Sequence, residues 1–203
     1  YKRDIKVIYN LLNTVYHYVP KRDNNYFSFA SIGRLEPIKG NEIVIKAFIE
    51  LKKQIQNIRL YIIGDGSERK NLELLAKEAG IHEDINFTGF LSSENIMNLF
   101  KDIDVFISGS MLETFGVPVI ESWMMGRPVI IADNHPLVGF VNKSNGAIFE
   151  SNHEGSVESL TKKMREVYEM TYDHRNISNE CEDIFSRDKV LAQIEQVYKI
   201  DSI

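Results

Sequence analysis

Two hydrophobic patterns alternate along the chain. Short apolar runs rich in β-branched and aromatic residues are followed by longer segments in which apolar residues recur every three or four positions. The short runs predict buried β-strands, and the longer segments predict helices with one apolar face. Strands are expected at residues 26–32, 58–64, 85–90, 104–110, 127–133 and 146–150. Helices are expected at residues 41–56, 67–79 and 92–101, from about residue 118, and at 186–200.

Residues that favour helix ends support these boundaries. Ser67 is expected to cap the second helix, and Gly80 follows its last turn. Ser92 or Ser93 is expected to cap the third helix. Pro118 falls in the first turn of the fourth, where the missing N–H of proline costs nothing.

The repeated alternation of strand and helix predicts the fold class. It is typical of an α/β domain in which helices cover both faces of a parallel sheet. From about Val157 onward the pattern is helical only, which predicts a helical C-terminal tail. We therefore divide the chain into a linker segment at 1–25, a Rossmann-like domain at 26–185 and a C-terminal helix at 186–203.

The bulk composition narrows the class of protein. At 203 residues, one domain with some additions is expected. Hydrophobic residues make up 43% and charged residues 26%, as in ordinary soluble globular proteins. The net charge of −5 disfavours nucleic acid as a partner, although a local pair of cations can still hold a diphosphate.

Particular residue types exclude further classes. The single cysteine, Cys181, rules out an internal disulfide and is expected to be inert in its acidic helical stretch. The five histidines show no zinc-ligand spacing, so no metal is expected. No apolar run approaches the ~20 residues of a membrane span. We expect a cytoplasmic protein without a span, with peripheral membrane attachment of a full-length form as the alternative.

Four glycine-containing loops each follow an expected strand. Their sequences are GRLEPIKG at 33–40, GDGS at 64–67, GFLSS at 89–93 and GSMLETFG at 109–116. The loops after the strands of an open parallel sheet share one edge, where ligands bind. Chemistry-bearing residues distant in sequence are thereby expected around one cleft, namely Arg34, Lys39, Gly66, Phe90, Glu113 and Glu121.

Two cations lie in the first of these loops. Arg34 can grip two phosphate oxygens at once, and Lys39 can act as a point charge. Gly33 and Gly40 allow the backbone to approach a ligand closely. The segment therefore fits a diphosphate, and a solvated turn before a helix is the alternative.

Two carboxylates flank the start of the helix at Pro118. Glu113 lies in the preceding loop, and Glu121 lies within the first turn or so of the helix. Carboxylates can hold sugar or ribose hydroxyls. Paired carboxylates also occur in glycoside hydrolases, but a hydrolase of neutral glycosides has no use for two cations. His135 follows another strand, and a single loop histidine without a partner predicts no role.

In order and spacing, these residues resemble a known family. The pattern G-R-L-x-x-x-K-G occurs at 33–40, G-x-G at 64–66 and E-x(7)-E at 113–121, with SMLETFG at 110–116. Over about residues 26–150 the chain is similar to the C-terminal, nucleotide-sugar-binding half of the group 1 (family 4) retaining glycosyltransferases. The resemblance implies one half of a GT-B fold.

The resemblance also implies roles for individual residues. Arg34 and Lys39 would hold the diphosphate of the donor, and Glu121 would bind the ribose hydroxyls. Glu113 would be catalytic, because it would hold the transferred sugar and stabilise its cation-like transition state. Backbone groups near Phe90 would frame the nucleobase. The implied donor-binding set is Gly33, Arg34, Lys39, Gly66, Phe90, Thr114, Phe115, Gly116 and Glu121.

The implied reaction is a transfer with retention. A nucleotide-diphosphate-sugar, expected to carry UDP and a hexose-type sugar, would be the co-substrate, and no cofactor or metal would be needed. The leaving diphosphate would take the proton of the acceptor, so that positioning and charge stabilisation do most of the work. A saccharide or lipid-linked acceptor in polysaccharide or glycolipid assembly would bind to an N-terminal domain. Only 25 residues precede the first expected strand, so that domain is expected to be absent and the chain to transfer nothing alone.

The chain departs from the family pattern in two places. Many members carry Gly-Gly-x-x-E where this chain has DNHPLVGF at 133–140, and Thr114 stands where glycine is frequent. Both differences bear on donor-sugar specificity. A non-hydrolysing nucleotide-sugar epimerase, a non-catalytic nucleotide-binding module and a plain response-regulator-like domain are the alternatives.

Overall fold

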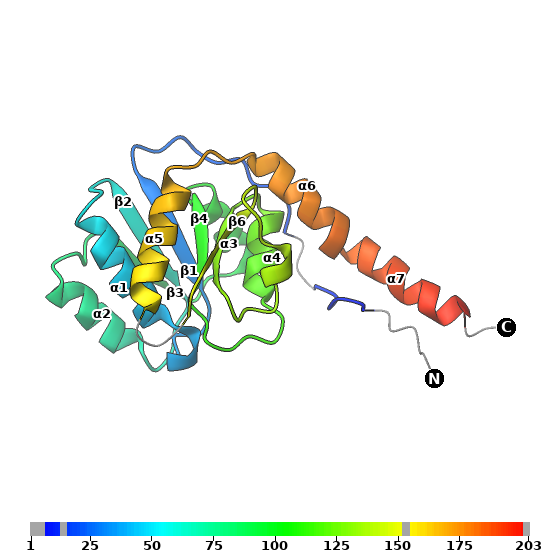
Figure 1. Cartoon of the computed structure of the whole chain (residues 1–203), viewed down its shortest axis with the longest axis horizontal. Coiled ribbons are helices and arrows are strands. Elements are labelled where there is room, and N and C mark those ends of the chain that lie inside the picture. Colours follow the sequence, from blue (N-terminus) through cyan, green and yellow to red (C-terminus); the bar gives the residue numbers. More distant parts are fainter. Residues whose placement is uncertain (1–6, 13–15, 152–154, 201–203) are drawn as a thin grey trace.

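A six-stranded parallel sheet forms the centre of the protein (Figure 1). The computed structural model describes residues 7–12, 16–151 and 155–200. The strands follow the order β3-β2-β1-β4-β5-β6. Their bounds are Phe27–Ile32 for β1, Ile58–Ile63 for β2, Ile85–Gly89 for β3, Val105–Ser108 for β4, Val129–Ala132 for β5 and Gly146–Phe149 for β6. The predicted Rossmann-like class is confirmed.

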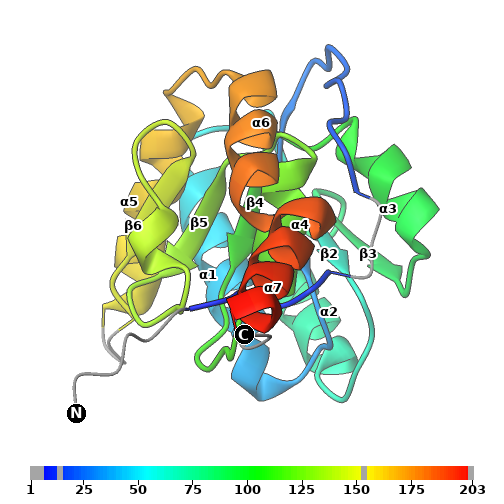
Figure 2. The same ribbon diagram turned by 90° about the vertical axis from the view of Figure 1, so that its right-hand side faces the viewer.

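Helices cover both faces of this sheet, as predicted (Figures 1 and 2). One face carries α1 (Asn41–Lys52), α2 (Arg69–Glu78) and α5 (Ser156–Tyr168). The other face carries α3 (Ser93–Phe100), α4 (Val117–Met124) and α6 (His174–Phe185). Two short 3-10 helices, η1 (Pro37–Lys39) and η2 (Val138–Phe140), lie in loops after β1 and β5.

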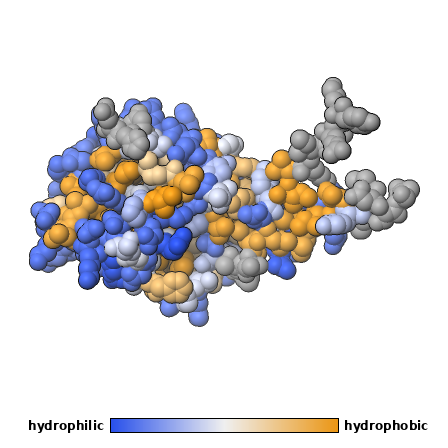
Figure 3. Space-filling model, turned by 90° about the horizontal axis from the view of Figure 1, so that it is seen from below, coloured by the Kyte–Doolittle hydropathy of each residue, from blue (hydrophilic) through white to orange (hydrophobic). Residues whose placement is uncertain are grey.

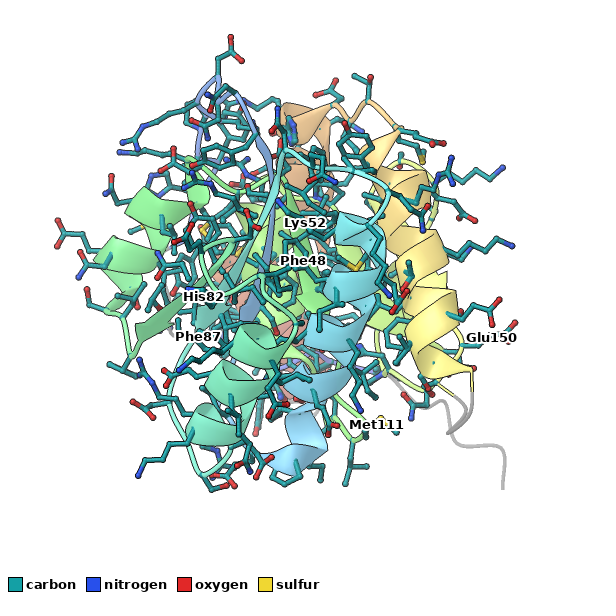
Figure 4. All side chains as sticks on the ribbon, turned by 90° about the vertical axis from the view of Figure 1, so that its left-hand side faces the viewer. Phe48, Lys52, His82, Phe87, Met111 and Glu150 are labelled. Carbon is teal, nitrogen blue, oxygen red and sulfur yellow. The ribbon has the colours of Figure 1, made fainter. Side chains whose placement is uncertain are left out.

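Alternating residues of the strands build two separate cores. In β2, Leu60 and Ile62 pack under α1 and α2, whereas Tyr61 and Ile63 face the layer of α3, α4 and α6. Successive side chains of a strand point to opposite faces, so a strand that is covered on both sides reads as a continuous apolar run. Figure 4 shows Phe48 of α1 turned towards the sheet.

Two predicted helix ends differ from the structure. The first helix stops at Lys52 rather than at Gln56. The backbone must be extended before β2, because the carbonyl of Asn57 already accepts the N–H of Phe27 in β1, at 2.9 Å. The second helix is not capped by Ser67, since it begins at Arg69 with no side-chain cap. The cap predicted for the third helix is confirmed at Ser92, whose hydroxyl accepts the N–H of Asn95 at 3.3 Å.

The described part of residues 7–25 contains no helix or strand, and it packs against the layer of α3, α4 and α6. Tyr16 and Val19 are buried there. The Val19 carbonyl accepts a hydrogen bond from Nη2 of Arg127 at 2.9 Å. The segment assigned to 1–25 includes residues 1–6 and 13–15, which lie outside the described residues.

Arg127 is a buried cation that no sequence pattern predicted. Its guanidinium is fully buried and donates to the carbonyls of Phe100, Met125 and Val19. Burial lowers the pKa of Arg127 to about 10, against a smaller opposing effect of the Asp104 carboxylate. The side chain remains charged at neutral pH and joins three chain segments at the end of the sheet opposite the loops described below.

The last helix, α7 (Arg187–Ile200), projects beyond the sheet (Figure 1). It contacts α6 and runs on past the edge of the domain. Figure 3 shows apolar residues gathered on this projecting part, and Tyr198 of α7 is largely exposed. Residues 201–203 of the predicted C-terminal helix lie outside the described residues. Among the described helices, none combines the length and apolar character needed to cross a bilayer.

Candidate functional site

The loops after β1 and β4 meet backbone to backbone. Gly40 ends η1 with a φ of +63°, in the left-handed region that favours glycine. A Cβ atom there would lie 1.9 Å from the carbonyl oxygen of Gly109. The N–H of Met111 donates to the carbonyl of Ile38 at 2.9 Å. Figure 4 shows Met111 at the start of α1, so the two loops form one surface.

The loop after β2 is joined to the same assembly. A Cβ atom on Gly66 would lie 2.5 Å from the carbonyl oxygen of Leu35, so only glycine fits this approach. The hydroxyl of Ser67 donates to the carboxylate of Glu36 at 2.7 Å. Gly66 therefore allows the loop after β2 to approach the loop after β1 closely, and Ser67 joins the two loops by a hydrogen bond.

A cavity of about 220 Å³ opens at the carboxyl ends of β1 and β4. Its polar side chains are Ser31, Lys39, Asn41, Ser108, Ser110, Glu113 and His135. The hydroxyl of Ser31 donates to the amide oxygen of Asn41 at 3.0 Å, which holds these two lining side chains in place. A larger hollow of about 430 Å³ lies beside α6, and no lysine or arginine lines it. The smaller cavity is the better candidate for an anionic ligand.

Lys39 and Glu113 form an ion pair inside this cavity. The Lys39 ammonium donates to the Glu113 carboxylate, and the two side chains are 26% and 16% exposed. The predicted diphosphate cation and the predicted catalytic carboxylate thus neutralise each other in this structure. An anionic ligand at Lys39 would compete with Glu113 and would free its carboxylate.

Arg34 lies on the outer side of the same turn. Its neighbour Gly33 lines the cavity, whereas Arg34 is exposed and is not part of the lining. Its guanidinium makes no hydrogen bond or ion pair with other described residues, although Glu36 is close enough for electrostatic attraction. The two predicted cations are therefore separated, with one inside the cavity and one at the surface.

The N-terminus of α4 forms another wall. Gly116 precedes this helix with a φ of +86°, and no described side chain caps it. An uncapped helix N-terminus presents free N–H groups and a positive dipole end, which favour anions. In α4, Pro118 has no N–H and the N–H of Val119 donates to the Gly116 carbonyl at 3.0 Å, so the first turn keeps few free donors and the dipole end contributes the rest. Thr114, two residues earlier, is exposed.

The ring of Phe115 takes part in an aromatic cluster outside the cavity. It stacks on Tyr9 at 6.4 Å between ring centroids and meets Phe185 edge-on at 6.5 Å. Phe140 completes this cluster by packing against both Tyr9 and Phe185. The ring of Phe115 is thus engaged by this cluster, and Phe115 is not among the residues that line the cavity.

Two further predicted residues lie outside the cavity lining. Glu121 is the fifth residue of α4 and is half-buried near Tyr16. The pKa of Tyr16 is raised by burial and, to a smaller extent, by Glu121, against a hydrogen bond with Ser93 of α3. Phe90 follows the edge strand β3 and is 86% exposed. The structure brings Gly33, Lys39, Glu113 and Gly116 to one cavity, and its lining does not include Arg34, Gly66, Phe90, Thr114, Phe115 and Glu121.

His135 is a cavity residue to which sequence reasoning gave no role. It is 4% exposed, and its ring packs on Gly116, where an added Cβ atom would lie 2.3 Å from Cε1. Burial lowers the pKa of His135, while Glu113 acts to raise it and Lys39 to lower it. The position of His135 after a strand is the one sequence feature that could have indicated a place in the cavity. Its contact with Gly116 depends on tertiary structure and is not visible in the sequence.

Other chemistry is scarce in the described residues. They contain no group of three or more His, Cys, Asp or Glu side chains that could hold a metal ion. Cys181 is buried against α4, and burial raises the pKa of its thiol. A cysteine of this kind carries little thiolate and is a poor nucleophile.

Comparison with known proteins identifies the relatives of this chain. The sequence pattern of the family described as "Glycosyl transferases group 1" matches residues 16–183. An uncharacterized glycosyltransferase of Methanocaldococcus jannaschii is 26% identical over 171 residues, which are 83% of this chain and 44% of that protein. The chain thus spans less than half the length of that relative.

Solved structures of glycosyltransferases share the fold. The lipopolysaccharide outer core galactosyltransferase WaaB, in its apo form, superposes with a TM-score of 0.81 at 21% identity, over 97% of this chain and 56% of that one. Anabaena HepE in complex with UDP and glucose superposes with a TM-score of 0.75 at 22% identity, over 86% of this chain and 48% of that one. At these identities the likeness establishes the architecture, a GT-B glycosyltransferase domain.

Proposed function

Because the chain belongs to the group 1 glycosyltransferases, we propose that it is the donor-binding domain of a retaining enzyme. The donor is a nucleotide-diphosphate-sugar with UDP as its nucleotide and a hexose-type sugar to be transferred. One observation carries the proposal. The cavity at the carboxyl ends of β1 and β4 combines Lys39, Glu113 and the free N-terminus of α4. This combination offers positive charge for a diphosphate next to a carboxylate for a sugar.

The ion pair between Lys39 and Glu113 suggests how the donor engages. The diphosphate replaces the Glu113 carboxylate as the partner of Lys39, and the α4 N-terminus contributes N–H donors. Arg34 has no competing ion pair in the described structure, so its guanidinium is available to the same diphosphate. Glu113, once released, accepts hydrogen bonds from the sugar and stabilises positive charge that develops at its anomeric carbon.

The remaining roles are proposed from the family resemblance. Glu121 binds the ribose hydroxyls, and the exposed surface at Phe90 frames the nucleobase. The leaving diphosphate takes the proton of the acceptor hydroxyl, so the protein supplies orientation and charge. No metal or cofactor is required in this scheme.

The acceptor side of the reaction is proposed from the relatives. WaaB is a galactosyltransferase of the lipopolysaccharide outer core, and HepE was solved with UDP and glucose. We propose a saccharide or lipid-linked acceptor in polysaccharide or glycolipid assembly, held by an N-terminal domain of a longer protein. In this division, residues 1–25 link the two domains, 26–185 bind the donor, and 186–203 form the terminal helix.

Calorimetric titration with UDP, GDP and ADP tests the donor site. Lys39→Ala is expected to weaken binding of the preferred diphosphate by about tenfold to a hundredfold, because a charge-assisted contact is lost. Lys46→Ala is the matched control, since Lys46 lies on the exposed side of α1 and pairs with Glu42. The absence of diphosphate binding to the folded wild-type chain, or equal losses in both variants, would contradict the proposal.

A further inference from the structure

His135 carries a hydrogen-bond donor that the protein itself does not use. Its Nδ1 accepts the backbone N–H of Leu137 at 3.2 Å. A neutral imidazole that accepts at Nδ1 must carry its proton on Nε2. Within the described residues, this Nε2 is the one buried side-chain nitrogen or oxygen atom without a hydrogen-bond partner. Buried polar atoms are nearly always paired, so an unpaired donor in a cavity wall points to a ligand.

The surroundings of Nε2 limit what that ligand atom can be. A Cβ atom on Gly116 would lie 2.7 Å from Nε2, so the absence of a side chain there allows the ring to reach the start of α4. The Glu113 carboxylate lines the same cavity and acts on the imidazole electrostatically, as does Lys39. A ligand atom at Nε2 therefore meets a donor in a cavity that the acceptor Glu113 also lines.

A hydroxyl group satisfies both neighbours. It accepts the Nε2–H of His135 through a lone pair and donates its own proton to the Glu113 carboxylate. A phosphate oxygen can only accept, and the negative charge of Glu113 repels it. The chemistry of the pair thus favours a sugar hydroxyl over the diphosphate.

We propose that His135 binds a hydroxyl of the donor sugar and so contributes to the choice of sugar. The inference rests on the proposed function, because it requires a nucleotide-sugar in this cavity. His135 belongs to the segment DNHPLVGF at 133–140, which differs from the Gly-Gly-x-x-E expected from the family resemblance. A contact from His135 to a sugar hydroxyl would affect specificity, since a site that hydrogen-bonds a hydroxyl discriminates strongly against analogues that lack it.

Two amide variants of His135 distinguish the role of Nδ1 from that of Nε2. His135→Asn places an amide oxygen near the position of Nδ1, where it can still accept from Leu137, but has nothing at the position of Nε2. His135→Gln extends an amide nitrogen towards the position of Nε2 and keeps a donor there. Both variants and the wild-type chain are titrated with UDP, UDP-glucose, UDP-galactose and UDP-N-acetylglucosamine.

In the Asn variant, the best-bound UDP-sugar is expected to lose about tenfold in affinity, the effect of one buried hydrogen bond, while UDP itself is unchanged. The Gln variant is expected to keep most of that affinity. Unchanged discrimination between UDP-sugar and UDP in the Asn variant would overturn the inference. Equal losses for UDP and UDP-sugar would also overturn it, because they indicate contact with the phosphate.

A second measurement does not depend on a substitution. Nitrogen NMR of the histidine rings in the wild-type chain should show the Nε2 resonance of His135 shifting with UDP-sugar and not with UDP. A resonance that is indifferent to the sugar overturns the inference even where the Asn variant fails to fold. If the wild-type chain binds UDP but its Asn variant behaves like the wild type, the inference alone fails. If the wild-type chain binds no nucleotide, the proposed function fails as well.

Discussion

Replacement of Arg127 by methionine is expected to lower the free energy of unfolding by about 4 kcal/mol, because three buried carbonyl groups lose their donor. Methionine fills part of the volume, so most of the loss reflects the unpaired carbonyls of Phe100, Met125 and Val19. For a chain of this size, the midpoint of thermal unfolding should fall by about 10 °C. Urea unfolding followed by circular dichroism measures the change.

Two controls accompany this variant. Arg165→Ala removes an exposed arginine whose ion pair with Glu169 is worth about 0.5 kcal/mol or less. Arg127→Lys keeps the charge but cannot reach all three carbonyls, and an intermediate loss is expected. A loss below about 1 kcal/mol in Arg127→Met, less than one unpaired carbonyl should cost, would contradict the structural role described above.

Gly40→Ala is expected to cost about 3 kcal/mol and to abolish most nucleotide binding. The left-handed backbone alone costs about 1 kcal/mol with a side chain, and overpacking adds about 2 kcal/mol. The new methyl group would meet the carbonyl of Gly109, so the loop of Lys39 must move away from the loop of Glu113. Thermal unfolding and titration with UDP measure the two consequences.

Gly80→Ala is the control that separates the cost of the left-handed backbone from the cost of a steric clash. Gly80 has a φ of +70°, close to that of Gly40, but a Cβ atom there meets nothing within 4 Å. It should cost about 1 kcal/mol, the price of the backbone conformation alone, and should leave nucleotide binding unchanged. Similar losses of stability and binding in the two variants would show that the contact between the loops is unimportant.

The general fold could be predicted because local and global signals agree. The strands are short, mainly apolar runs, glycine-containing loops follow several of them, and Gly80 and Ser92 mark helix ends. The prediction that Ser67 caps the second helix was wrong, because the hydroxyl of a serine before a helix can also bind a partner distant in sequence, here Glu36. The helix at Asn41 was drawn too long, since the apolar period continues to Ile55 after the backbone has left the helix.

Within the candidate site, sequence patterns pointed to Lys39 and Glu113 but not to their mutual arrangement. Lys39 and Glu113 were assigned to different parts of a ligand, and their pairing in the cavity depends on two loops that meet at Gly40. His135 had no visible partner because its neighbours, Gly116 and Leu137, acquire meaning only through burial and a turn. Arg127 looked like an ordinary charged residue before a proline. Burial is a tertiary property, and a single sequence does not report it for a polar side chain.

The aromatic cluster of Tyr9, Phe115, Phe140 and Phe185 has a practical consequence. Phe115 follows Glu113 by two positions, and Tyr9 belongs to the segment that precedes the sheet domain. A truncated expression clone that starts at the first strand would delete one ring from this cluster and loosen the peptide that carries the carboxylate. Titrations on such a shortened clone would then describe a damaged pocket, so clones should retain the opening residues.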